Sequence, residues 1–160
     1  MCLYDYIMDP SIIEDISLGT KRKRNVTYHH HTESTPIHGF IKDICSSFLT
    51  ENGFKHQKEE WFMDVIRYNL VGDTKRVESG LAWHCENDNY PNVITVLMYL
   101  RIDETLKDAN IMYKDREGVK QVFPLKSGTT IIMDGKVPHK PQDPYGTGRR
   151  DLIIMSFKKE

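Results

Sequence analysis

Two histidines and one carboxylate in this sequence have the residue types and the spacing that could hold a metal ion. His84 and Glu86 lie two positions apart, so on a β-strand, where side chains alternate, both would point to one side and Cys85 to the other. A further isolated histidine, His139, follows later in the chain. Two histidines and one carboxylate around an open coordination face form the ligand set that non-haem Fe(II) uses.

Two adjacent arginines, Arg149 and Arg150, follow His139 and precede the apolar run at residues 152–155. An arginine close to the metal would suit the far carboxylate of a dicarboxylate co-substrate, because the planar guanidinium matches the geometry of a carboxylate. Alternation along a strand allows only one of the two side chains to face inward. The residue types alone leave the choice between them open.

Length and composition favour a single soluble domain over residues 1–160. A chain of 160 residues suffices for one sizeable core, and a formal net charge of -1 gives no global attraction to nucleic acid or an anionic membrane. Three widely spaced cysteines argue against a disulfide scaffold and for a reducing, intracellular compartment. No apolar run approaches the roughly 18 residues of a membrane span, and no signal peptide is evident, so we expect a cytoplasmic protein without membrane contact.

The N-terminal part is less regular than the rest, and we expect a partly flexible segment over residues 1–34. Lys21–Arg24 form a basic run, which we interpret as solvated surface, with contact to a phosphate backbone or a localisation signal as alternatives. His29–His31 are adjacent, so they would point to opposite sides of a strand. We therefore interpret them as polar surface rather than as a metal site.

Residues 35–53 predict a supporting helix. Thr35 can cap it, Pro36 suits its first position, and Asn52 with Gly53 can end it. Apolar residues at helical spacing form one stripe that would pack against a sheet, namely Ile37, Phe40, Ile41, Ile44, Cys45, Phe48 and Leu49.

Residues 59–158 predict a β core. Short segments rich in branched and aromatic residues alternate with turn signals, and no strong helical pattern interrupts them. The predicted strands cover residues 61–70, 80–86, 93–100, 110–113, 121–123, 128–133 and 152–157. Many short strands after a helix predict a mostly β fold with a helical buttress, that is, a jelly-roll or cupin-like barrel.

From about residue 62 to residue 158, these motifs resemble the Fe(II)- and 2-oxoglutarate-dependent dioxygenases, particularly their prolyl-4-hydroxylase-like branch. The family pattern is a strand, H-x-D, a strand that ends in Tyr-Leu, a P-x-x-x-G turn, a distal histidine, and an arginine or lysine that opens the last strand. The corresponding residues of this chain are Tyr68, His84-Cys85-Glu86, Tyr99-Leu100, Pro124 with Gly128, His139 and Arg149. The resemblance implies a double-stranded β-helix.

The resemblance also implies a role for each matching residue. His84, Glu86 and His139 would hold Fe(II). Arg149 would pair with the distal carboxylate of 2-oxoglutarate, and Tyr99 would hydrogen-bond the same co-substrate. O₂ would be the second co-substrate, with ascorbate as an optional reductant.

Two positions in the pattern leave alternatives. Glu86 stands where H-x-D is usual, and Asp88, two positions further on, is the alternative carboxylate ligand. For the arginine, counting along the apolar pattern of the last strand favours Arg149 in the family register, and Arg150 is the alternative.

For the reaction, the resemblance implies hydroxylation of a protein side chain, with proline as the first expectation and a protein or peptide as the partner. One alternative is oxidation or demethylation of a nucleobase, with Lys21–Arg24 and Lys75–Arg76 as contacts to the nucleic-acid backbone. Another is a non-catalytic cupin-like binding module. Tyr68 and Trp83 are interpreted as packing residues in each case.

Overall fold

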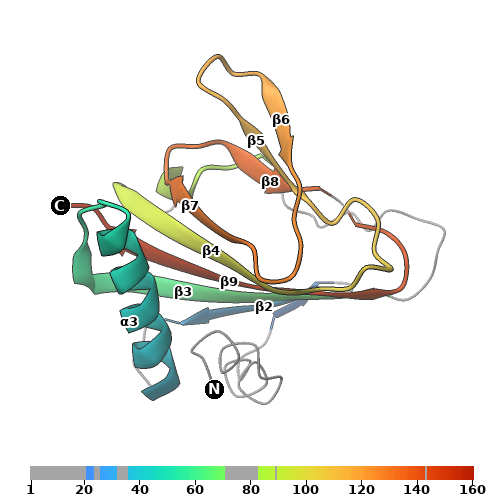
Figure 1. Ribbon diagram of the computed structural model, residues 1–160, viewed down its shortest axis with the longest axis horizontal. Coiled ribbons are helices and arrows are strands. Elements are labelled where there is room, and N and C mark those ends of the chain that lie inside the picture. The colour runs from blue at the N-terminus through green and yellow to red at the C-terminus, as the bar shows by residue number, and fades with distance from the viewer. Residues whose placement is uncertain (1–20, 24–25, 32–35, 71–82, 89, 143) are drawn as a thin grey trace.

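The computed structural model describes residues 21–23, 26–31, 36–70, 83–88, 90–142 and 144–160, with side chains from residue 36 onwards except Ile37 (Figure 1). Its elements in chain order are β1 (Lys21–Lys23), β2 (Val26–His31), α3 (Pro36–Glu51), β3 (Gln57–Leu70), the 3₁₀ turn η1 (Glu86–Asp88), β4 (Val93–Ile102), β5 (Ile111–Lys114), β6 (Lys120–Phe123), β7 (Thr130–Asp134), β8 (His139–Pro141) and β9 (Gly148–Lys158). The basic run and the histidine run fall largely on β1 and β2. The expectations for residues 1–20 and for Lys75–Arg76 lie outside the described residues.

The strands form two antiparallel sheets that face each other. The large sheet has the strand order β1-β2-β3-β9-β4-β7, and the small sheet has the order β6-β5-β8. Figure 1 shows the small sheet above the large one, with the β5–β6 hairpin standing out from the body. Strands that are distant in the chain are neighbours within both sheets, which is the arrangement of a double-stranded β-helix. The predicted mostly β, jelly-roll architecture is confirmed.

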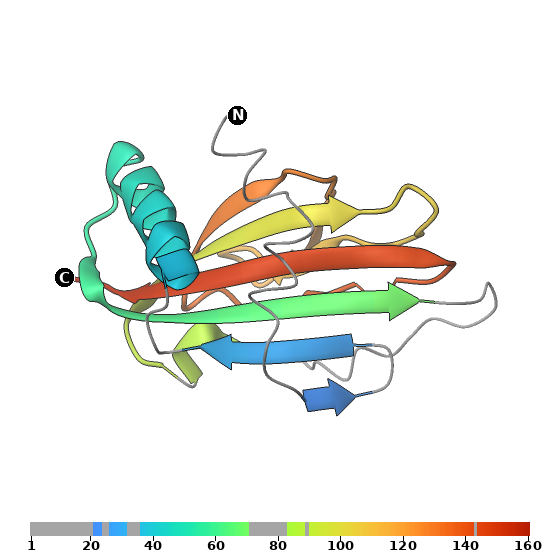
Figure 2. The same cartoon turned by 90° about the horizontal axis from the view of Figure 1, so that it is seen from below.

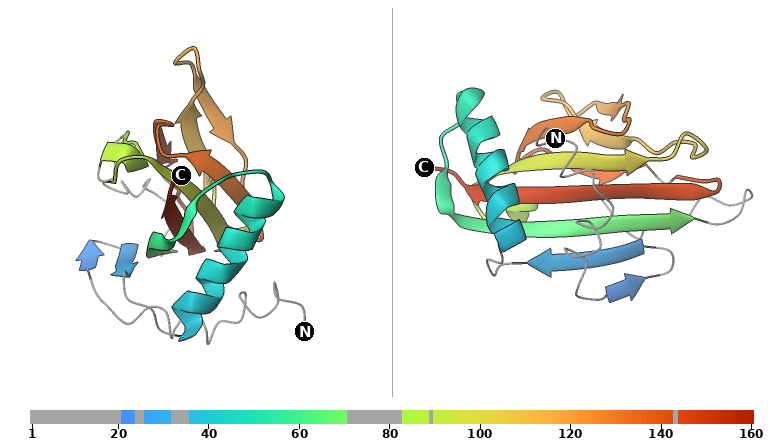
Figure 3. Two further views of the ribbon diagram at one scale, coloured as in Figure 1. Left: turned by 90° about the vertical axis from the view of Figure 1, so that its left-hand side faces the viewer. Right: turned by 60° about the horizontal axis from the view of Figure 1, so that its bottom comes forward.

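Helix α3 crosses one end of the outer face of the large sheet (Figures 2 and 3). Its apolar stripe buries Ile41, Cys45 and Leu49 in a cluster with β-sheet residues that include Met63 and Val96. The helix ends at Glu51, and Gly53 then adopts a positive φ of 81° that a residue without a Cβ tolerates best. The predicted helical buttress is therefore confirmed. Among the described residues, no helix has both the length and the apolar character required to cross a membrane.

The register of the large sheet determines which side chains face the small sheet. Directly paired residues in antiparallel strands point to the same face, and Tyr68 pairs with Arg150 while Tyr99 pairs with Leu152. This inner face contributes to an apolar cluster that joins both sheets: Ile66, Tyr68, Leu97, Tyr99, Ile111, Met133 and Leu152. The interior of the barrel is thus mainly apolar, and the polar groups within it mark the candidate site.

Candidate metal centre

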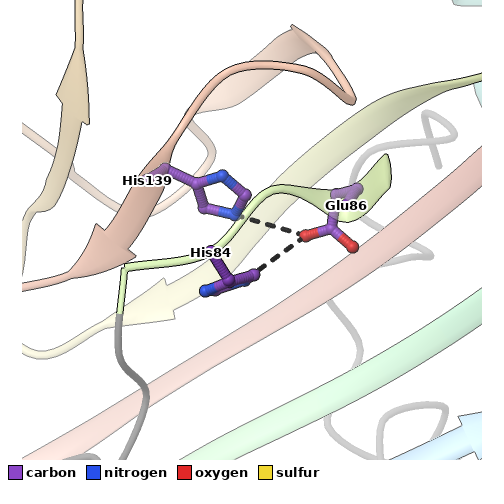
Figure 4. Close-up of side chains that lie close together, drawn as sticks. All are labelled: His84, Glu86 and His139. Atoms are coloured by element: carbon purple, nitrogen blue, oxygen red, sulfur yellow. Dashed lines mark ion pairs between the residues drawn. The ribbon is translucent and has the colours of Figure 1, made fainter. Parts of the chain in front are cut away.

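The structure brings together the three predicted metal ligands from separate elements (Figure 4). The Oε1 atom of Glu86 lies 3.2 Å from Nε2 of His139 and 3.6 Å from Nε2 of His84. The two imidazole rings have their centroids 4.4 Å apart. One potential ligand atom from each residue lies within 4.8 Å of the others, so all three can contact a single ion.

Backbone pairing holds the two histidines side by side. His84 and His139 form an isolated antiparallel bridge, in which each backbone N–H donates to the carbonyl of the other residue, at 3.1 and 2.9 Å. Because directly paired residues share a face, both rings project to the same side of the small sheet. The distance between these two ligands is therefore set by the sheet itself.

Glu86 reaches the site from a 3₁₀ turn rather than from a strand, so the predicted strand over residues 80–86 is wrong at its end. The Asp88 carboxylate accepts a hydrogen bond from the Cys85 N–H at 2.9 Å, which stabilises a tight turn in place of an extended chain. The turn is also joined to the large sheet, since the Asn87 side-chain oxygen accepts from the Val93 N–H at 3.1 Å. Asp88 is exposed and its carboxylate faces the backbone, so Glu86 is the carboxylate beside both histidines.

A hydrogen bond fixes the protonation of one histidine ligand. Nδ1 of His139 lies 2.9 Å from the Val137 carbonyl oxygen, which can only accept, so Nδ1 carries the proton. Nε2, which faces Glu86 at 3.2 Å, is then the nitrogen of His139 that can coordinate a metal ion. His139 is 4% exposed and Glu86 is 7% exposed, whereas the His84 side chain is 31% exposed. The centre is therefore open to solvent mainly on the side of His84.

The electrostatics of Glu86 fit a cation. Burial alone would raise its pKa, but hydrogen bonds from His139 and His84 outweigh burial and lower the pKa to about 2. The carboxylate is thus ionised at neutral pH in a site that is largely shielded from water. A buried anion needs a cationic partner, and two imidazoles with one carboxylate are the donor set for Fe(II) with further coordination positions open. The residues present fit this metal.

The structure does not bring Arg149 into the barrel. Its Nε atom lies 2.8 Å from the Asp151 carboxylate, which also pairs with Arg67 at 3.0 Å. Asp151 is almost fully buried, so it holds both arginines on the outer face of the large sheet. The sequence favoured Arg149 over Arg150 as the inward arginine, and the structure places Arg149 on the outer face instead. The ion pair between Arg149 and Asp151 was not evident from the sequence.

Arg150 is the arginine inside the barrel. It is 1% exposed, and its guanidinium carbon lies 4.1 Å from the centroid of the Tyr68 ring. One nitrogen donates a long hydrogen bond of 3.4 Å to the Asn110 carbonyl, while Nε and Nη2 have no hydrogen-bond partner among the described residues. Two buried donors of a permanent cation are therefore available to a ligand.

Tyr99 lies near this cation in the inner cluster and is 4% exposed. Burial raises the pKa of its hydroxyl, and the charge of Arg150 opposes that increase, so the hydroxyl remains a neutral donor.

The sequence did not indicate Asn110, whose carbonyl contacts Arg150. No motif marks it. Tyr68 was interpreted as packing, and it does pack, but against a cation.

Two cavities are lined by residues from elements around the centre, and none of the three candidate ligands is among their lining residues. A groove of about 420 Å³ contains Phe62 and Tyr90, whose rings stack at 3.9 Å, and the Tyr90 N–H donates to the Glu86 carbonyl at 3.1 Å. One wall of this groove is thus attached to the turn that carries the carboxylate ligand. A smaller cavity of about 230 Å³ includes Tyr113, which pairs with His139 in the small sheet. Its lining residues are mostly apolar: Ile111, Tyr113, Phe123, Ile131, Ile132, Met133, Asp134 and Val137.

Comparison with known proteins identifies the fold. No protein-family model and no curated protein sequence matches this chain. A prolyl hydroxylase from Trichoplax adhaerens, in complex with a peptide fragment of the hypoxia inducible factor oxygen degradation domain, superposes with a TM-score of 0.64 at 14% identity, over 96% of this chain and 77% of that one. An oxidoreductase of the 2OG-Fe(II) oxygenase family from Burkholderia pseudomallei gives 0.62 at 10% identity, over 92% and 75%. This chain has the fold of the 2-oxoglutarate/Fe(II) oxygenases.

A third solved structure has the same fold. A prolyl-4-hydroxylase from Pseudomonas putida superposes with a TM-score of 0.58 at 11% identity, over 98% of this chain and 84% of that one. The double-stranded β-helix expected from the resemblance is thereby confirmed. At these identities the similarity concerns the fold, and arguments about activity must come from the residues of the site.

Proposed function

We propose that this protein is an Fe(II)- and 2-oxoglutarate-dependent dioxygenase. The observation that carries the proposal is a buried arginine with two unused donors inside the same barrel whose wall holds two histidines and a carboxylate. His84, Glu86 and His139 would bind the metal through Nε2, a carboxylate oxygen and Nε2. Bound Fe(II), with O₂ and 2-oxoglutarate, would supply the oxidising chemistry.

The role of Arg150 would be to bind and orient the co-substrate. A buried guanidinium without an anion is unfavourable, and the Tyr68 ring compensates it only in part through its face. The distal carboxylate of 2-oxoglutarate would accept hydrogen bonds from Nε and Nη2 of Arg150, and the Tyr99 hydroxyl would donate a further one. Arg149 is less suited to this role, because its charge is already paired with Asp151.

For the prime substrate we propose a protein side chain, with proline as the first residue to test. The groove beside η1 supports this choice, because aromatic surfaces such as the stacked Phe62 and Tyr90 suit apolar side chains of a peptide. The peptide complex of the Trichoplax adhaerens prolyl hydroxylase, which has the same fold, is consistent with it. The backbone hydrogen bond from Tyr90 to Glu86 would bring a side chain bound in the groove close to the turn that carries Glu86.

The test is succinate release from 2-oxoglutarate with added Fe(II) in air, together with Fe(II)-dependent binding of 2-oxoglutarate without O₂. We expect His139→Ala to abolish both signals. His56→Ala is the matched control, because His56 bonds to Ser46 at 2.7 Å far from the candidate ligands in the chain, and it should retain both. Absence of Fe(II)-dependent 2-oxoglutarate binding in the wild type would reject the proposal. Binding without succinate would point to a non-catalytic module instead.

A further inference from the structure

The outer face of the small sheet carries lysines on all three of its strands. Lys114 of β5 lies directly opposite Lys120 of β6. Met112, on the same side of β5 as Lys114, lies opposite Lys140 of β8. Because directly paired residues share a face, the three lysines project together, away from the side on which His139 faces the metal centre.

An aromatic ring lies among these lysines. The Nζ atoms of Lys114 and Lys120 are 5.2 and 5.9 Å from the centroid of the Trp83 ring, which is within the range of a cation–π contact. Trp83 immediately precedes the ligand His84, and Lys140 immediately follows the ligand His139. We call Trp83, Met112, Lys114, Lys120, Val122 and Lys140 the lysine face.

In the part of the chain that the structure describes, no carboxylate forms an ion pair with the lysine face. Among the described residues, none of its three lysines forms an ion pair, whereas Lys42, Lys58, Lys158 and Lys159 each pair with an Asp or a Glu. Like charges placed directly opposite each other on a sheet are destabilising. The pairing of Lys114 with Lys120 is therefore a cost to the fold that an anionic ligand would relieve.

The carboxylate in the turn of the same hairpin, Asp115, forms no ion pair with these lysines within the part of the chain that the structure describes. Asp115 accepts hydrogen bonds from the Val119 and Glu117 N–H groups, at 2.8 and 3.1 Å, and from the Gln121 amide at 2.9 Å. Its oxygens thus shape the turn. The ammonium groups of the three lysines are therefore without an ion-pair partner among the described residues, and they can pair with carboxylates of a bound partner.

The lysine face also has an apolar component, which indicates the class of partner. Val122 is 53% exposed, and Val119, in the adjoining turn, is 54% exposed. Met112 is partly exposed beside them. Methionine and exposed valines suit apolar side chains of a polypeptide, whereas the phosphate backbone of a nucleic acid offers these side chains no apolar partner.

We propose that the lysine face docks an acidic, partly apolar segment of the polypeptide substrate. Carboxylates of that segment would pair with Lys114, Lys120 and Lys140, and its apolar side chains would pack on Val122 and Met112. Strand β8 of this sheet carries His139 and forms a backbone bridge with His84, so docking would hold the substrate near the candidate metal centre. The term substrate rests on the proposed function, but the binding surface itself can be tested without turnover.

The experiment uses the fluorescence of Trp83. The chain has two tryptophans, so Trp61→Phe leaves Trp83 as the single reporter. The probe is a short peptide of alternating glutamate and leucine, and we expect it to quench or shift the Trp83 emission in a salt-sensitive manner. In the same background, Lys114→Gln with Lys120→Gln should weaken the Kd by about three- to tenfold, since each exposed ion pair contributes at most roughly a factor of five.

The matched control is Lys42→Gln with Lys58→Gln, which removes two lysines that pair with carboxylates on and near α3. This variant should bind the glutamate–leucine peptide as tightly as its parent. Two comparison probes are the same peptide with lysine in place of glutamate and an oligothymidylate, and both should bind at least tenfold more weakly. An equal loss in both double variants, no loss in either, or preferential binding of the oligonucleotide would overturn the proposal.

A separate measurement distinguishes this inference from the proposed function. Fe(II)-dependent 2-oxoglutarate binding should be unchanged in the Lys114→Gln, Lys120→Gln variant, because the lysine face lies on the opposite side of the sheet from the metal ligands. If the protein bound the peptide through these lysines but did not bind 2-oxoglutarate, the docking proposal would stand and the proposed dioxygenase function would be rejected.

Discussion

Replacing Arg150 by glutamine gives the sharpest test of the interior of the barrel. In the structure this guanidinium is 1% exposed and makes one long hydrogen bond of 3.4 Å. Two further donors have no partner. Truncating one member of a buried charged pair costs roughly 2–5 kcal/mol. We therefore expect Arg150→Gln to weaken 2-oxoglutarate binding by about 3 kcal/mol, or roughly a hundredfold.

The assay is calorimetric titration of the Fe(II)-loaded protein with 2-oxoglutarate in the absence of O₂. Arg149→Gln is the matched control, because it removes the same charge one residue away, on the opposite face of β9. It should change the affinity less than about threefold, since its ion pair with Asp151 is made on the outer face. A larger loss in Arg149→Gln than in Arg150→Gln would refute the assignment.

A stability measurement on the protein without ligands tests the same reasoning independently. An unpaired buried charge is costly, and replacement by an apolar side chain of similar length removes that cost. Arg150→Met should therefore raise the free energy of unfolding by about 1–2 kcal/mol in urea titrations. A marked destabilisation by Arg150→Met would show that the guanidinium donors are already hydrogen-bonded in the ligand-free protein and are not available to a ligand.

Three further predictions concern the surroundings of the site. A Cβ on Gly135 would lie 2.7 Å from the Val93 carbonyl oxygen, so Gly135→Ala should displace the neighbouring turn, cost about 1–3 kcal/mol in thermal unfolding and weaken metal binding. Asp151→Asn should lower the free energy of unfolding in urea by about 2–4 kcal/mol, because an almost fully buried carboxylate that pairs with Arg149 is lost. In the metal-free protein, the pKa of Glu86 is lowered from 4.5 to about 2, so its contribution to stability is complete above pH 4.5 and is lost as the pH falls towards 2. Acid titration of Glu86→Gln should lack that component, and an unchanged acid profile would contradict it.

Much of the metal centre followed from residue types and order. Two histidines and a carboxylate were selected by their types and spacing, and the structure places His84, Glu86 and His139 together. The expected geometry of Glu86 was nevertheless incorrect. Strand alternation assumes an extended chain, but Asp88 accepts a hydrogen bond from the Cys85 backbone and tightens the chain into a turn. A periodic sequence pattern does not show when a side chain competes with strand pairing for a backbone N–H group.

The choice between the two arginines shows a different limit. The parity of a strand fixes which residues share a face, but it does not fix which face is inside. Here Asp151 and Arg67, from different strands, form an ion-paired cluster on the outer face and draw Arg149 to it. Arg150 could have been preferred by counting in steps of two from Leu152, which faces inward. That count needs the inward residue to be known first.

The three candidate ligands of the metal centre are attached to different layers of the barrel. His84 and His139 are attached to the small sheet through β8, whereas the turn that carries Glu86 is hydrogen-bonded to the large sheet at Val93 and at Gly135. A bound ion would therefore cross-link the two sheets and close a chain loop from residue 84 to residue 139. Cross-links of this kind reduce the entropy of opened states. Backbone amides of β8 and of η1 should then exchange with deuterium together, and more slowly once the ion is bound, so that this end of the barrel opens as one cooperative unit.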